Sequence, residues 1–264
     1  MLRKFLNHAK ALLGIGKSRF LMLCALLMLF VSAHAQAQAP KETETERINS
    51  PKIRALAVGF ENDLRNLHLL DADGGSAGTI RLMLLSYSRP FEAPINKGLI
   101  TFGVEDGVDA NGITQYRPVA SVAWAPEDEK LALIFIPRNF RGQANDDEAY
   151  FIRKMNMSAN SFALGSTTVL NLSSAVSYVT IGEHEKTIQP HQEVTISEVN
   201  DVLSANMVGL KVAYRAEEEI HTIKQTRIRY LKRLRYLIIL YSDIEKRRVE
   251  LALVSDSGRL FDSE

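Results

Sequence analysis

The amino-acid sequence predicts an all-β protein with two β-sandwich (Ig-like) domains in tandem, behind a signal peptide that is removed on export. Two observations predict the sandwiches. The apolar residues fall in short runs that are rich in Val, Ile, Tyr and Thr. Clusters of Gly, Asp, Asn and Pro separate these runs at the spacing of strands and turns.

Residues 1–39 have the three-part layout of a bacterial-type secretory signal. The basic residues of this segment are Arg3, Lys4, Lys10, Lys17 and Arg19. An unbroken apolar run of 12 residues follows at 20–31, well short of the roughly 20 that cross a bilayer as a helix. Small residues around Ala35 and Ala37 suit cleavage. We therefore expect a protein exported to the periplasm or the medium, in contact with the membrane only through its leader. An uncleaved anchor is the alternative.

Cysteine content and charge narrow the class of protein. Cys24 is the only cysteine and lies in the leader, so the mature chain holds no disulfide although export usually leads to an oxidising compartment. Without the five basic residues of the leader, 27 Lys and Arg stand against 31 Asp and Glu, a net charge of −4. A general nucleic-acid binder is therefore not expected.

The mature chain divides into a polar, flexible spacer at 40–50, a first domain at 51–138, a linker at 139–148 and a second domain at 149–264. The strands expected in the first domain are 53–60, 64–70, 79–87, 99–104, 116–124 and 131–136. Those expected in the second domain are 150–157, 167–172, 176–181, 187–188, 193–196, 210–214, 227–241 and 249–254.

Each half has an acidic turn near its end, and the two turns resemble each other in sequence. The residues at 125–130 are expected to form a hairpin-type connection, and residues 242–248 follow a strand in the same style. The match is short, but it suits two similar sandwiches.

Residues 217–241 admit two interpretations. Apolar residues from Ile220 to Tyr241 recur at helical steps, and a basic amphipathic helix would favour docking on an acidic surface. Against a helix, 226–230 alternates and 237–240 is apolar on every side, as in a central strand. We predict strands. The arginines expected to be solvated in this segment are Arg227, Arg229, Arg233 and Arg235.

One pattern resembles a known group. The stretch 161–173 (SFALGSTTVLNLS) precedes a strand and then Pro190, and 67–74 (LHLLDADG) lies in the first half. Together they resemble the motifs of a loose group of exported, uncharacterised bacterial tandem β-sandwich proteins. The resemblance implies the fold and an exported location, and it brings no catalytic residue.

Two short motifs are better explained as turns. Gly74 to Gly78 fits G-x-S-x-G around Ser76, but a nucleophile elbow needs a following helix, and residues 79–87 favour a strand. Asn111-Gly112 does not complete a calcium loop, because Gly107 and Pro118 would occupy its first and last positions. Asp71 and Asp73 are likewise expected to form a turn, with a weak surface calcium as the alternative.

The histidines outside the leader match no zinc signature. They are His68, His184, His191 and His221. Glu183, His184, Glu185 and His191 could converge near one hairpin. We nevertheless expect no metal, no cofactor and no catalytic residue.

Trp124, the only tryptophan, ends an alternating strand. We expect it in the core, with a sugar-stacking platform as the alternative.

The sequence thus favours an exported, non-catalytic binding or scaffolding protein of the bacterial envelope, whose partner is an envelope protein or a polysaccharide. The alternative is a secreted hydrolase that uses Ser76 or a metal near His184.

Overall fold

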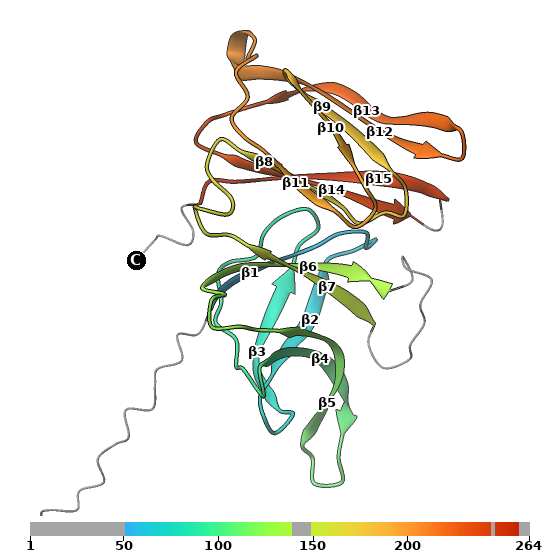
Figure 1. Ribbon diagram of the computed structural model, residues 1–264. Coiled ribbons are helices and arrows are strands. Elements are labelled where there is room, and N and C mark those ends of the chain that lie inside the picture. Colours follow the sequence, from blue (N-terminus) through green and yellow to red (C-terminus); the bar gives the residue numbers. More distant parts are fainter. Residues whose placement is uncertain (1–50, 139–148, 244–245, 259–264) are drawn as a thin grey trace, which may run out of the picture. The chain divides into compact units, whose positions relative to one another are not determined.

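A computed structural model describes residues 51–138, 149–243 and 246–258 (Figure 1). The named elements of these residues are strands and a short 3-10 turn, η2 (Ser204–Asn206), and the described residues contain no α-helix. The predicted all-β class is confirmed. The predicted leader (1–39), spacer (40–50) and linker (139–148) lie outside the described residues.

Two sheets make up the first half. One has the order β1-β6-β7, in which β1 and β6 are parallel and β6 and β7 antiparallel. Its strands are β1 (Lys52–Ala57), β6 (Lys130–Pro137) and β7 (Tyr150–Asn156). The other sheet is antiparallel, in the order β3-β2-β4-β5. Its strands are β2 (Leu64–Leu70), β3 (Ser76–Leu82), β4 (Leu99–Val108) and β5 (Thr114–Ala123). A shared core joins the two sheets, with the Phe102 and Phe135 rings edge to face at 5.0 Å.

Two further sheets make up the second half. One has the order β11-β8-β14-β15, with β8 and β14 parallel. Its strands are β8 (Thr167–Asn171), β11 (Glu193–Ile196), β14 (Arg235–Asp243) and β15 (Arg248–Asp256). The other is antiparallel, in the order β10-β9-β12-β13. Its strands are β9 (Ser177–Ile181), β10 (His184–Ile188), β12 (Met207–Ala216) and β13 (Glu219–Arg229). Val212 and Ile238 are among the buried residues of the core between them.

The two halves repeat one strand plan. The parallel pair β1 and β6 with antiparallel β7 corresponds to β8, β14 and β15, and the order β3-β2-β4-β5 corresponds to β10-β9-β12-β13. Strand β11 is an addition to the second half. The division into two domains stays a prediction. Because β7 pairs with β6, a boundary that keeps every sheet whole lies after Asn156 rather than before Tyr150.

The two sheets that contain parallel strands also pack against each other. Their outward faces share a third core, to which Ile134 of β6 and Ile239 of β14 contribute without any exposed surface. These two sheets are therefore buried on both faces. This explains why the runs at 131–136 and 237–240 are apolar at successive positions, as strands buried on both faces require.

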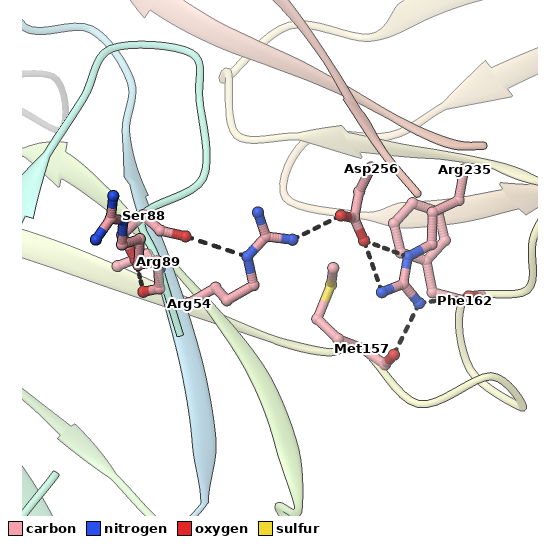
Figure 2. A network of polar contacts seen from close by, with 8 residues as sticks. Arg54, Ser88, Arg89, Met157, Phe162, Arg235 and Asp256 are labelled. Carbon is pink, nitrogen blue, oxygen red and sulfur yellow. Dashed lines mark hydrogen bonds and ion pairs between the residues drawn. The ribbon is translucent and has the colours of Figure 1, made fainter. Parts of the chain in front are cut away.

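A buried carboxylate ties the same two sheets together (Figure 2). Asp256, at the end of β15, accepts a hydrogen bond of 2.6 Å from Arg54 of β1 and bonds of 2.7 and 2.8 Å from Arg235 of β14. All three residues are at most 6% exposed. Arg235 also donates to the carbonyls of Met157 and Phe162. One carboxylate thus joins strands that are about 200 residues apart in the chain.

The segment 217–241 forms strands rather than a helix, as predicted, but the strand expected at 227–241 is divided by a turn between β13 and β14. The expectation that Arg235 is solvated is wrong. Arg227, Arg229 and Arg233 are exposed, whereas Arg235 is 4% exposed. Its partner Asp256 lies opposite it on the neighbouring strand β15, and both are buried together with Arg54 of β1, which strand alternation alone did not indicate.

The acidic turn at 125–130 is not a hairpin, because β5 and β6 belong to different sheets. Asp128 stabilises this connection between the two sheets, because its carboxylate accepts a hydrogen bond from the Ala125 amide and pairs with Lys154 of β7. Strands β14 and β15, by contrast, do form an antiparallel hairpin. The two acidic turns are therefore not equivalent positions of the repeated plan.

Trp124 follows β5, is partly buried and packs against the first core, as expected. Its indole nitrogen is buried without a hydrogen-bond partner among the described residues. The ring thus contributes to packing in the first half rather than forming an open platform.

We predict that Asp256→Asn lowers the free energy of unfolding by about 3–5 kcal/mol, because it leaves two buried guanidinium groups without their counter-charge. Urea denaturation followed by circular dichroism measures the change. The matched control is Glu193→Gln, which removes an exposed ion pair between the halves, with Arg153 at 3.3 Å. It should cost no more than about 1 kcal/mol. Equal effects of the two substitutions would contradict the structure.

The ion pairs of Asp256 with Arg54 and Arg235 make the free energy of unfolding depend on pH. Burial acts to raise the pKa of Asp256, but hydrogen bonds from Arg235 and Arg54 outweigh it and lower this pKa. The stabilisation is therefore complete above the unfolded pKa of about 4. It is lost as pH falls through the lower folded value. The difference between wild type and Asp256→Asn should shrink only in that acid range.

Candidate functional site: a basic groove on an exposed sheet face

The outward face of the sheet β10-β9-β12-β13 is polar. Alternation sends Val208, Leu210 and Val212 of β12 into the core and Gly209, Lys211 and Arg215 outward. The register then sets the neighbours across the sheet. Lys211 lies between Thr180 of β9 and Gln225 of β13, and Gly209 lies opposite Arg227.

A shallow groove of about 410 Å³ crosses this face. Its lining residues are Thr180, Gly182, Gly209, Leu210, Lys211, Gln225, Thr226 and Arg227. Gly209 opens it, because a Cβ atom placed on this residue would meet no atom within 4 Å. The backbone at Gly209 does not require glycine, since its φ lies outside the left-handed range. The hollow therefore depends on a missing side chain.

The cations beside this groove are available to a ligand. Lys211 and Arg227 are exposed, and among the described residues neither side chain has a hydrogen bond or an ion pair. Arg215, on the same face, lies over the ring of Tyr178 at 5.6 Å. Glu185 of β10 also lies on this part of the sheet, where it pairs with Thr180 in the register. The face therefore offers basic groups, amide and hydroxyl groups and one half-buried aromatic ring.

The corresponding face of the first half is closed. At Gly103 of β4, an added Cβ would meet the Leu70 side chain at 2.8 Å and the Arg117 carbonyl at 3.0 Å. The ring of Tyr116 covers His68 beside it, with centroids 4.7 Å apart. The two halves therefore share a strand order but differ in their outward faces. The second half has an open basic groove there, and the first half has a filled surface.

A larger groove of about 670 Å³ lies beside the start of β2. Its central carboxylate is already engaged. Asp63 pairs with Arg81 at 3.0 Å and accepts from the Leu84 amide at 3.1 Å. The hydrogen bond from Arg81, followed by that from Leu84, lowers the pKa of Asp63. The charge of Asp63 therefore serves the local fold.

Ser76, the predicted alternative nucleophile, lies beside two other candidate groups. Its Oγ is 2.9 Å from Nδ1 of His68, whose Nε2 is 3.6 Å from Oε1 of Glu105. His68 is 7% exposed, whereas Ser76 is exposed. A serine, a base and an acid are thus adjacent, although Ser76 begins a strand and no helix follows it. The sequence indicated Ser76 but not its neighbours, which come from β2 and β4.

The other predicted motifs form turns. Asp71 accepts hydrogen bonds from the amides of Asp73 and Gly75, and Asp109 accepts them from Asn111 and Ile113. These bonds engage the Asp71 and Asp109 carboxylates within their own turns. They confirm the expected turns.

The residues around His184 also have local roles. Glu183 accepts from the amides of Asn200 and Asp201, and these backbone hydrogen bonds lower the pKa of Glu183 to about 2. His184 lies 3.4 Å from the Glu183 carboxylate. Among the described residues, no group of three or more His, Cys, Asp and Glu side chains could hold a metal ion.

No known protein family matches the chain, and no curated protein does. A similar solved structure is named as that of a "putative cell adhesion protein" from Bacteroides uniformis. It is 8% identical, covers 80% of this chain and 99% of its own, and has a TM-score of 0.20. A TM-score of 0.20 does not show a shared fold. In the described part of the chain, no helix has the length and apolar character needed to span a membrane.

Proposed function

We propose that the chain is an exported, non-catalytic binding or scaffolding protein of the bacterial envelope. The observation that carries the proposal is the open groove at Gly209, where exposed cations without internal partners flank a polar sheet face. Unpaired charges beside an open hollow suit an external ligand. The leader predicted at residues 1–39 supports an envelope location.

The rest of the fold suits such a role. The two middle sheets, β1-β6-β7 and β11-β8-β14-β15, are buried on both faces and give a stiff support. A site on strands is also held more precisely than a site on loops. The outward face of β10-β9-β12-β13 can thus present its side chains in a fixed row without the ligand having to order them.

We predict that the immobilised mature chain retains a component of a bacterial envelope extract, either a polysaccharide or a protein. The measurement is elution followed by sugar analysis and mass spectrometry. Beads that carry an unrelated protein of equal net charge are the control. Equal retention on both beads, together with turnover of an esterase or glycosidase substrate panel, would contradict a binding role.

A secreted hydrolase is the second candidate, because Ser76, His68 and Glu105 are adjacent. A base within hydrogen-bond distance of a hydroxyl is what nucleophilic catalysis requires. The acid is held loosely, however: the Glu105 side chain is 63% exposed and 3.6 Å from the imidazole. Ser76 is also one end of a hairpin, paired opposite Leu70. The binding role is therefore the stronger proposal.

A fluorophosphonate probe separates the two candidates, since it labels base-activated serines. The binding role predicts no labelling of Ser76 above that of Ser161, an exposed serine without a histidine partner among the described residues. Peptide mapping by mass spectrometry gives the comparison. Labelling that is selective for Ser76 and is abolished in Ser76→Ala and His68→Gln would make the hydrolase the better account.

A further inference from the structure

We propose that the groove at Gly209 binds an acidic polysaccharide, a chain of sugars that carry carboxylate groups. This inference rests on the proposed binding function and names the ligand class of its site. The partner is identified by the chemistry of the groove: two cations, a hydroxyl, an amide and a nearby aromatic ring.

The cations are placed to contact neighbouring charges on one polymer. Arg227 lies directly opposite Gly209, and Lys211 is two residues further along β12. Diagonal neighbours of this kind have side chains that start about 7–8 Å apart. The hollow at Gly209 lies beside both. A chain in this groove can therefore reach both cations without either one being buried.

The remaining groups suit sugars. Gln225 and Thr180 flank Lys211 on the adjacent strands and offer an amide and a hydroxyl to sugar hydroxyl groups. Tyr178 lies on the same face, two residues from Thr180, and is half-buried. Arg215 lies over this ring at 5.6 Å, so the two side chains together offer a cation and an aromatic ring beside the groove.

The charge balance favours an acidic polysaccharide over nucleic acid. The chain without its leader has a net charge of −4, which opposes binding to a dense phosphate backbone. Proteins that bind DNA well use about 6–10 phosphate contacts, whereas this groove offers two unpaired cations, with Glu185 near them. Two cations suffice to pair with carboxylates on two sugars of one chain, which also presents neutral hydroxyl groups to Gln225 and Thr180.

Gly209→Val is the decisive variant. Valine fits the φ at this position, and its Cβ has open space, so the fold should be kept or slightly stabilised. Its side chain fills the hollow. The second variant is Lys211→Ser combined with Arg227→Ser, and the matched control is Arg65→Ser, an exposed cation of the larger groove on the first half.

Binding of the mature protein to polygalacturonate, neutral dextran and single-stranded DNA is measured by biolayer interferometry, with circular dichroism as the check of folding. We expect binding to polygalacturonate alone. Both groove variants should weaken it about tenfold or more: the double serine variant because it removes hydrogen bonds from charged groups, and Gly209→Val because its side chain fills the hollow. Arg65→Ser should leave it unchanged.

The outcomes separate the two proposals. Equal or tighter binding to DNA would overturn the assignment to a polysaccharide. Binding to polygalacturonate that persists in the folded groove variants would overturn the site. A wild-type protein that binds no polyuronate, yet retains an envelope component, would overturn this inference alone. Failure to retain any component would overturn the binding function as well.

Discussion

The structure depends on the contact between its two middle sheets, and one buried carboxylate marks that contact. Asp256 lies between Arg54 of β1 and Arg235 of β14, with little solvent around any of the three. Burying three charges is costly unless every one is paired. The apolar core around Ile134 and Ile239 supplies the favourable free energy of this contact, because it removes large apolar side chains of both sheets from water. The ion pairs then fix how the sheets align.

One strand plan, used twice, has given two different surfaces. In the first half, Leu70 and Tyr116 fill the outward face around Gly103 and His68. In the second half, the outward side of Gly209 is open. The sheets that contact each other must stay apolar on both faces, whereas the outer sheets can change their outward residues without disturbing a core. Binding groups are therefore expected on the outer sheets, where the groove lies.

The sequence was sufficient for the all-β class and for most strands, because short β-branched runs between turn residues have few other solutions. Asn171 and Ser173 of the recognised motif also have the local role of turn formers, since Asn171 accepts from the amide and the hydroxyl of Ser173. What could not be predicted depends on how non-consecutive strands are arranged. Asp256 lies opposite Arg235 in the β14-β15 hairpin, but its burial also involves Arg54 of β1. Glu105 reaches His68 because β4 pairs with β2. The open side of Gly209 likewise needs the neighbouring strand.

The most direct test of this account uses Trp124, which reports on the first half alone, and a substitution in the second half. Ile239→Ala removes side-chain atoms from the core shared by the middle sheets, which should cost about 2–5 kcal/mol. Urea unfolding is followed by Trp124 fluorescence and by circular dichroism. If the sheets unfold as one unit, both midpoints fall together. A Trp124 midpoint that stays at the wild-type value while the circular dichroism midpoint falls would contradict the account.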